Sequence, residues 1–335
     1  PRVSDGSLLF LMHLASKMRT AKEGGGRIGI VLNGSPLFTG GAGQGESEIR
    51  RWVLENDLVE AIIGLPKDMF YNTGIATYIW LLDNDKPQER RGKVQLVDAT
   101  SKFTKMRKNL GDKRNEISPE NIDEIVKLYD AFEENEESKI FDIQDFGYTT
   151  ITVEQPLRQN WAVTEGRIAI ALENRSLQKL PPQKLELLRE SLHELASLNS
   201  ASTTDGKEFA SRIKQELAHH ELNASQVKAL INGLAERDET APMQTDTKGN
   251  LVPDTDLRDT ENVPLGRDID EYIETEVSPH LEHFWVDRSK DKIGYEIPFT
   301  RHFYKYTAPR PLEEIDAELN QLVKKISQLL KEIEN

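Results

Sequence analysis

The first hundred residues alternate between helical and extended patterns of apolar side chains. From Ser4 to Arg19 apolar residues recur every three or four positions, which predicts a helix with Ser4 or Asp5 as its N-cap. A second helical pattern covers residues 46–56. Short, largely apolar runs bounded by turn residues predict strands at 27–32, 58–65, 75–82 and 93–98. A strand, a helix and further strands joined by short links indicate an open α/β sheet.

The strand pattern also predicts how this sheet is built. The run at 27–32 is typical of a strand covered on both faces, and the last three strands follow one another without a helix, as in an antiparallel edge. Only about half of a doubly wound sheet is accounted for, so we expect one strand edge to lie open. The chain starts at Pro1 without an initiator Met or a signal-peptide pattern, so we expect it to be part of a longer protein.

After Thr100 the pattern changes to a chain that is mostly helical and polar. A helix is predicted from Ser118 to Phe132, a strand or hairpin arm at 146–153, mostly helices at 164–236, and a long loop at 237–265. These changes predict three regions: the α/β part at 1–155, a helical region with a linker at 156–265, and a C-terminal region at 266–335.

The last segment carries the most regular pattern of the chain. Its apolar residues alternate in spacings of three and four, which predicts a helix with a heptad seam. The members of this seam are Leu312, Ile315, Leu319, Leu322, Ile326 and Leu329. Such a stripe has to be covered, either by the chain's own domain or by a helix of another subunit, and the periodicity does not distinguish the two.

Composition narrows the possible functions. The 335 residues include 57 acidic and 43 basic ones, and the formal net charge is -14. A polyanion therefore cannot bind over the whole surface, and a nucleic-acid role needs a local basic patch or a basic partner. The chain has no cysteine, which excludes disulfides, thiolate metal sites and cysteine nucleophiles. No apolar run is long enough for a membrane span, and we expect a cytoplasmic protein.

Basic side chains do gather at one place, just after the predicted sheet. They are Lys102, Lys105, Arg107, Lys108, Lys113 and Arg114. The cluster is either a site of local phosphate contact or a solvated loop.

The familiar catalytic motifs are missing from the sequence. Residues 40–45 are rich in glycine but do not have the spacing of a dinucleotide fingerprint, so we expect a surface loop. His280, His283 and Asp287 match no zinc-protease spacing, and we expect no metal site. The residues alone thus do not indicate a complete catalytic site.

One loop has chemistry that suits a nucleic acid. Residues 65–77 join two predicted strands and carry the adjacent aromatics Phe70 and Tyr71. An aromatic ring at the rim of a sheet can stack on a base that has left the duplex, whereas most Phe side chains simply pack in a core.

Several segments together resemble the modification subunit of type I restriction-modification systems. They are residues 24–32, 45–52, 65–80 and 293–299, and the resemblance runs over nearly the whole chain, most weakly between about 170 and 250. It implies an N6-adenine DNA methyltransferase with a Rossmann-like sheet and S-adenosyl-L-methionine as methyl donor. The fold class we expect is therefore α/β: the C-terminal part of such a sheet, followed by a mostly helical region.

The resemblance carries over to only a few residues. The family's glycine-rich cofactor loop and its Asn-Pro-Pro-aromatic motif do not occur in this sequence. In family order both lie upstream, so the chain looks like the part that follows the catalytic loop and is expected to be inactive alone. Phe70 looks like the aromatic that stacks on the flipped adenine. Phe10 looks like the aromatic that borders the cofactor's adenine, although core packing would explain it equally well.

The resemblance further implies partners. They are DNA, a specificity subunit that reads the sequence, a second modification subunit and a restriction subunit. Reading of the DNA sequence by the specificity subunit is compatible with the acidic composition of this chain. In the family the C-terminal region contacts the specificity subunit, which favours an intermolecular role for the heptad helix. The alternative is a scaffold module without catalysis of its own that joins subunits of a DNA-modifying complex.

Overall fold

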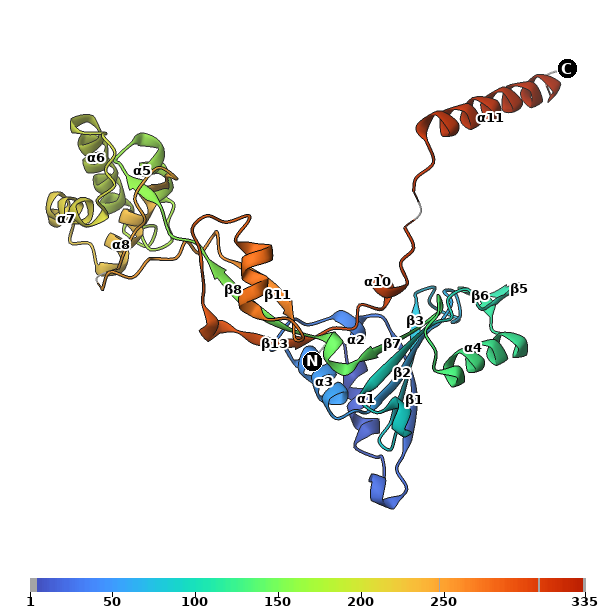
Figure 1. The fold of residues 1–335 in the computed structure, drawn as a ribbon. Coiled ribbons are helices and arrows are strands. Elements are labelled where there is room, and N and C mark those ends of the chain that lie inside the picture. The colour runs from blue at the N-terminus through green and yellow to red at the C-terminus, as the bar shows by residue number, and fades with distance from the viewer. Residues whose placement is uncertain (1–4, 247, 307, 334–335) are drawn as a thin grey trace. The chain divides into compact units, whose positions relative to one another are not determined.

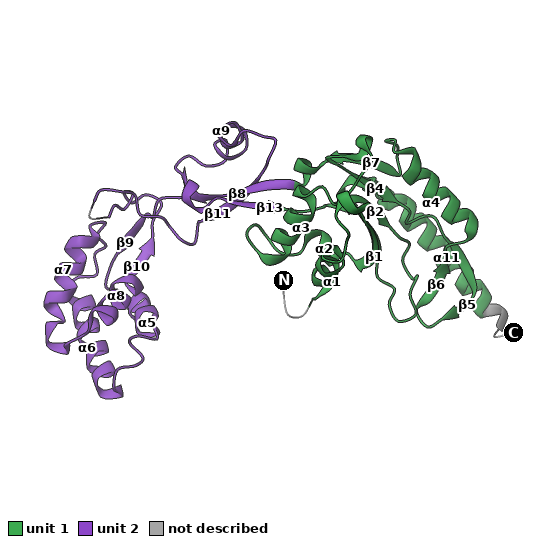
Figure 2. Cartoon of the chain, turned by 90° about the horizontal axis from the view of Figure 1, so that it is seen from below, with its two compact units in different colours: residues 1–146, 295–335 green, residues 147–294 purple. Residues whose placement is uncertain are grey.

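The computed structural model describes residues 5–246, 248–306 and 308–333 (Figure 1). Its contacts divide the chain into two compact units (Figure 2). Unit 1 comprises residues 1–146 and 295–335, and unit 2 comprises residues 147–294. Unit 2 is therefore an insertion within unit 1 in terms of chain order.

Unit 1 is built on a five-stranded mixed sheet with the order β1-β3-β2-β4-β7. The strands are β1 (Arg27–Asn33), β2 (Val59–Gly64), β3 (Thr77–Asp83), β4 (Lys93–Asp98) and β7 (Ser138–Asp142). β3 pairs antiparallel with both β1 and β2, β4 pairs parallel with β2, and β7 pairs antiparallel with β4. The α/β class predicted from the sequence is confirmed.

The sheet differs from the predicted one in two respects. β1 is the end strand of the sheet, and it is not covered on both faces as predicted, because Val31 is 46% exposed. β4 is parallel to β2, so β2, β3 and β4 do not form a simple antiparallel meander. The reason is that β3 lies between β1 and β2, and the chain returns to the far side of β2 to form β4.

Helices lie on both sides of this sheet, with α1, α2 and α3 on one side and α4 on the other in both views (Figures 1 and 2). They are α1 (Ser7–Ala15), α2 (Ser35–Phe38), α3 (Gly45–Glu55) and α4 (Pro119–Ala131). The α4 side buries Ile125 against Ile63 and Val97. Successive residues of a strand point to opposite faces of the sheet. Ile62 and its partner Trp80 therefore point to the face opposite α4.

Helix boundaries follow local capping. The Ser118 side chain accepts from the Asn121 backbone N–H and starts α4 as predicted. α1 is shorter than predicted, and its N-cap is Gly6 and not Asp5, although the Asp5 carboxylate accepts from the Ser7 backbone N–H at 3.0 Å. Ser4, the other predicted cap, lies outside the described residues.

Unit 1 also contains a two-stranded hairpin, β5 (Thr104–Leu110) and β6 (Lys113–Glu116), and two C-terminal helices, α10 (Phe299–Phe303) and α11 (Leu312–Ile333). The predicted heptad segment is thus a helix. Within the described residues, every helix is too short or too polar to cross a membrane.

Unit 2 combines a helical core with two small sheets. β9 (Gln159–Trp161) pairs with β10 (Ala235–Arg237), and the helices are α5 (Glu165–Leu172), α6 (Pro182–Leu198), α7 (Gly206–Glu216), α8 (Ala224–Gly233) and the short α9 (Ile269–Tyr272). β8 (Gly147–Glu154) pairs with β11 (Asp259–Pro264), β12 (Trp285–Val286) and β13 (Lys292–Tyr295). Phe209 and Leu188 lie at the centre of the helical core.

This division differs from the three consecutive regions expected from the sequence, with boundaries near 155 and 265. The predicted loop at 237–265 contains β11, which pairs with β8 along its whole length. Residues 266–294 therefore belong with the helical region, while the residues from Tyr295 onward belong with the α/β part.

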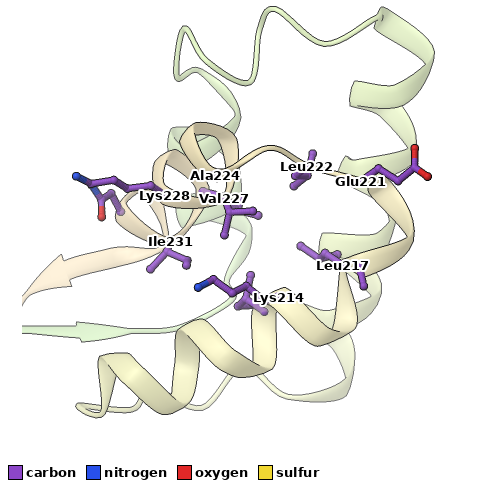
Figure 3. A pocket seen from close by; sticks show the side chains of 12 residues that line it. Lys214, Leu217, Glu221, Leu222, Ala224, Val227, Lys228 and Ile231 are labelled. Carbon is purple, nitrogen blue, oxygen red and sulfur yellow. The ribbon is translucent and has the colours of Figure 1, made fainter. Parts of the chain in front are cut away.

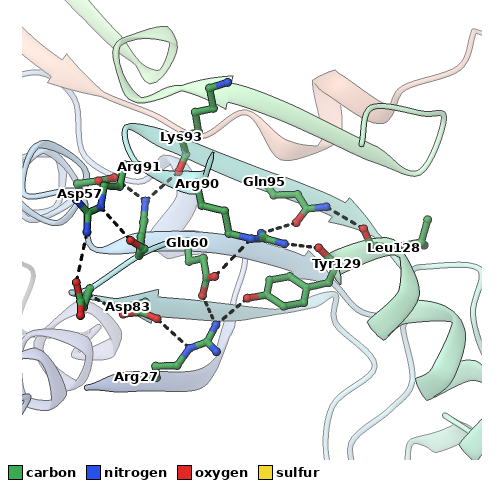
Figure 4. A network of polar contacts seen from close by, with 12 residues as sticks. Arg27, Asp57, Glu60, Asp83, Arg90, Arg91, Lys93, Gln95, Leu128 and Tyr129 are labelled. Atoms are coloured by element: carbon green, nitrogen blue, oxygen red, sulfur yellow. Dashed lines mark hydrogen bonds and ion pairs between the residues drawn. The ribbon is translucent and has the colours of Figure 1, made fainter. Parts of the chain in front are cut away.

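A network of charged side chains holds α4 and the starts of the strands together in unit 1 (Figure 4). Glu60 on β2 is 1% exposed and lies between Arg27 and Arg90. The Arg90 guanidinium also donates to the Gln95 side chain and to the Tyr129 carbonyl. The hydrogen bond to Glu60 raises the pKa of Arg27, and burial raises the pKa of Tyr129. Arg27, Glu60 and Gln95 lie near the first residues of β1, β2 and β4. The loop of residues 65–76 leaves β2 at its other end.

We expect Glu60→Gln to destabilise the protein by about 3 kcal/mol, because Arg90 would stay buried without its carboxylate. The measurement is urea denaturation. Glu48→Gln is the matched control: it removes an exposed partner of Arg51 and should cost less than about 0.5 kcal/mol. Equal costs for the two variants would contradict a central role of Glu60.

Candidate nucleic-acid interface

The aromatic loop of residues 65–76 follows β2 at the end where this strand terminates. It is closed at its base by the Leu65 N–H, which donates to the Thr77 carbonyl at 2.9 Å, and nearer its tip by a bridge between Phe70 and Thr73. The Phe70 side chain is 36% exposed and Tyr71 is 70% exposed. Phe70 is therefore not a core residue of the described chain, and both rings are accessible to a ligand.

The basic residues predicted from the sequence lie next to this loop, because β5 and β6 form a hairpin that is hydrogen-bonded to it. The Asp112 N–H donates to the Tyr71 carbonyl at 2.9 Å, and the Arg114 N–H donates to the Asp68 carbonyl at 2.9 Å. A cavity of about 460 Å³ opens where the two meet. Its walls are Asp68, Phe103, Lys105, Met106, Asn109, Arg114 and Asn115.

Five of the six cations lie on this hairpin, and the sixth does not. Lys105, Arg107, Lys108, Lys113 and Arg114 are on the hairpin, and none of them forms an ion pair with a carboxylate of the described residues. Lys102 lies before the hairpin, and its amine contacts Glu124 at 3.4 Å and Glu137 at 3.0 Å. The hydrogen bond to Glu137 raises the pKa of Lys102. The hairpin thus carries positive charge available to an anion, while that of Lys102 is neutralised.

The glycine-rich loop has a structural role. Arg50 on α3 is fully buried, and its guanidinium donates to the carbonyls of Pro36, Thr39 and Gly40 at 2.7–3.0 Å. It also donates to the Tyr295 carbonyl at 2.7 Å. Two segments that resemble the modification subunits, 45–52 and 293–299, therefore meet at this arginine.

The same C-terminal segment packs behind the aromatic loop. Phe299 contacts Tyr78 edge to face, with ring centroids 5.1 Å apart. A Cβ on Gly64, the last residue of β2, would lie 2.8 Å from the Phe299 ring. The close approach needs glycine at this position and fixes the strand from which the aromatic loop starts.

Phe10 and the heptad seam belong to neither the aromatic loop nor the hairpin. Phe10 is on α1, which contacts β1 and α3, and it is 69% exposed, so core packing within the described chain does not explain it. On α11, Leu312, Leu319, Leu322, Ile326 and Leu329 are all more than half exposed, and Ile315 is half-buried. Most of this stripe is thus uncovered in the described chain, and what covers it stays a prediction.

Another cavity, of about 500 Å³, lies in unit 2 between α7 and α8 (Figure 3). Leu217, Leu222, Val227 and Ile231 line it, with Lys214 among its polar side chains. Its walls are mainly apolar and bring together no nucleophile with a base. It can take an apolar group, but it offers no catalytic chemistry.

The sequence did not indicate the residues that join hairpin and loop. Asn115 is 8% exposed, and its side-chain amide donates to the Lys67 carbonyl at 2.8 Å. Gly111 has a φ of 61°, and a Cβ there would lie 2.4 Å from the Tyr71 carbonyl oxygen. The only local signal was a glycine followed by Asp112 between two extended segments, which is typical of a hairpin turn.

Comparison with known proteins finds matches for part of this chain. Residues 2–155, which include the sheet, the aromatic loop and the hairpin, match the family model described as N-6 DNA Methylase. Over this segment the chain is therefore similar to N-6 DNA methylases. The resemblance to type I modification subunits is confirmed by relatives that carry that description.

Two of these relatives come from Methanocaldococcus jannaschii. The chain is 38% identical over 120 residues to the type I restriction enzyme MjaVII methylase subunit, covering 36% of this chain and 20% of the relative. It is 30% identical over 178 residues to the MjaVIII methylase subunit, covering 51% and 30%. The matched part thus spans at most about a third of these relatives' length.

A solved structure is also similar. It is a type I restriction-modification methyltransferase subunit from Streptococcus thermophilus, with a TM-score of 0.38 and 24% identity over 44% of this chain and 28% of that one.

Proposed function

We propose that this chain is the C-terminal part of an N6-adenine DNA methyltransferase subunit of a type I restriction-modification system. The observation that carries the proposal is the junction of the exposed aromatic loop with a hairpin whose cations pair with no carboxylate of the described residues, within the segment that matches the N-6 DNA methylase model. In this proposal the loop supplies a base-stacking group and the hairpin supplies phosphate-binding groups, which is the combination that a base-flipping enzyme needs.

Phe70 is proposed to stack on the adenine after it has left the duplex. Stacking contributes about 1–3 kcal/mol per base, which offsets part of the few kcal/mol needed to unstack and unpair it. The ring would hold the adenine plane, so that its amino nitrogen stays in line with the methyl donor. The segment that orients this nitrogen, with the Asn-Pro-Pro-aromatic motif, is proposed to lie upstream.

The hairpin is proposed to contact the DNA backbone. A charge of -14 makes most of the surface repulsive to DNA, so the free cations of Lys105, Arg107, Lys108, Lys113 and Arg114 would locate the contact. Lys102 is left out of this proposal, because it is paired with two carboxylates.

The cofactor proposed is S-adenosyl-L-methionine, which supplies the methyl group when bound. The fit of the described residues to it rests on Phe10, whose exposed ring can cover an adenine face. The main binding loop is proposed to come from the upstream segment, together with strands that pair with the open edge of β1.

We expect Phe70→Ala to lower DNA methylation by the complete complex about tenfold or more, because one stacking contact is lost. Phe70→Trp should retain activity, since an indole stacks at least as well. The measurement is methyl transfer to adenine in duplex DNA, with complex assembly checked by size-exclusion chromatography. Unchanged methylation by the alanine variant would contradict the stacking role.

The partners proposed are a specificity subunit, a second modification subunit and a restriction subunit. What supports an intermolecular role for α11 is its apolar seam, of which five of the six residues between Leu312 and Leu329 are exposed in the described chain. The same exposure supports the alternative function, a scaffold module that joins subunits without catalysis. The two functions differ in whether Phe70 matters for methylation.

We expect Leu322→Asp combined with Ile326→Asp to abolish assembly of the complex, because two buried charges would be forced into a helix interface. Asn320→Asp with Ser327→Asp is the matched control, which adds the same charge to the polar face of α11. Native mass spectrometry of the co-expressed subunits measures the outcome. Full assembly of the double Leu322/Ile326 variant would contradict an intermolecular role of the seam.

A further inference from the structure

The contacts between the β5–β6 hairpin and the aromatic loop are made by the backbone and one amide side chain. Asp68 is the central acceptor: its carbonyl receives the N–H groups of Arg114 at 2.9 Å and Asn115 at 3.1 Å. The Asn115 side chain adds a third donor, to the Lys67 carbonyl at 2.8 Å. None of these contacts uses a charged side chain, so the hairpin cations stay available to a ligand.

Asp68 has an unusual backbone conformation. Its φ is 57°, in the left-handed region that a residue with a side chain rarely adopts. Such strain persists only where the surroundings determine the conformation, and it is typical of functional sites. Here the donors of Arg114 and Asn115 hold the Asp68 carbonyl, and Gly74 leaves room for its side chain. The conformation of the residue two positions before Phe70 is therefore set from the hairpin.

Asn115 also connects this junction to the cations. It pairs in register with Lys105 across the hairpin and follows Arg114 directly. A hairpin held by DNA phosphates would thus hold the Lys67–Asp68 backbone as well. A displacement of about 1 Å in a reacting group is enough to cost a large factor in rate.

We propose that Asn115 is a positioning residue that sets Phe70 against the flipped adenine, so that phosphate contact by the hairpin and base contact by the loop act as one unit. The proposal rests on the proposed methyltransferase function. It assigns the junction a role in catalysis and not in DNA affinity.

The test uses the complete modification complex with Asn115→Leu, which keeps the size of the side chain and removes its donor. We expect kcat to fall about tenfold, as for a lost stacking contact, while DNA affinity measured by fluorescence anisotropy changes less than about threefold. With 2-aminopurine at the target position, the fluorescence of the complex should shift in the same direction as for Phe70→Ala. In the double variant with Phe70→Ala, kcat should be no lower than for Phe70→Ala alone.

Two further variants make the result specific. Asn56→Leu removes an amide that also donates to a carbonyl at 2.8 Å, on α3, and should leave kcat unchanged. Gly111→Ala disturbs the other end of the junction, where its Cβ would meet the Tyr71 oxygen, and should reproduce the Asn115→Leu pattern.

The outcomes are separable. Unchanged kcat and fluorescence for Asn115→Leu, or effects that multiply with those of Phe70→Ala, would overturn the proposal while leaving the methyltransferase function intact. A parallel loss of DNA affinity would also overturn it, because Asn115 would then maintain the hairpin itself. If Phe70→Ala had no effect on methylation, the stacking function would fail first.

Discussion

The structure of unit 1 depends on the buried guanidinium of Arg50. A cation without solvent is tolerated only when its donors are satisfied, and here four backbone carbonyls accept from it. Three of these carbonyls belong to the segment after β1 and one to Tyr295, far along the chain. One side chain thereby fixes the glycine-rich loop, α3 and the returning C-terminal segment in one arrangement. Phe299 on that segment then packs against Gly64, from which the aromatic loop departs.

The candidate interface follows from this support. The aromatic loop extends from a strand that is packed on both sides, and the hairpin that carries the cations is attached to the loop by main-chain hydrogen bonds. Main-chain hydrogen bonds thus set the spacing of the two parts in the absence of a ligand, and for the proposed DNA contact this lowers the entropy that binding has to overcome. In so acidic a chain, a local group of cations such as the one on the hairpin favours the approach of a polyanion at that place.

The sequence predicted local features well and long-range contacts poorly. β4 begins and ends where its apolar run predicted, Ser118 caps α4, and the last segment is a helix, because these features depend on neighbours in sequence. The strand order, the ion pairs of Lys102 and the role of Asn115 depend on residues far apart or on backbone carbonyls, which leave no periodic pattern. Phe70 and the basic cluster were each visible in the sequence, but the hydrogen bonds between the aromatic loop and the hairpin were not.

The insertion of unit 2 has a consequence for how the protein is made. Arg50, Ser47 and Gly64 receive their partners from Tyr295 and Phe299, so the α/β part lacks these contacts until the ribosome has synthesised all of residues 147–294. The helical core of unit 2, whose contacts are internal, is complete before that point. During translation the helical core of the inserted unit can therefore fold first, and the contacts of the host unit with its C-terminal segment form only afterwards.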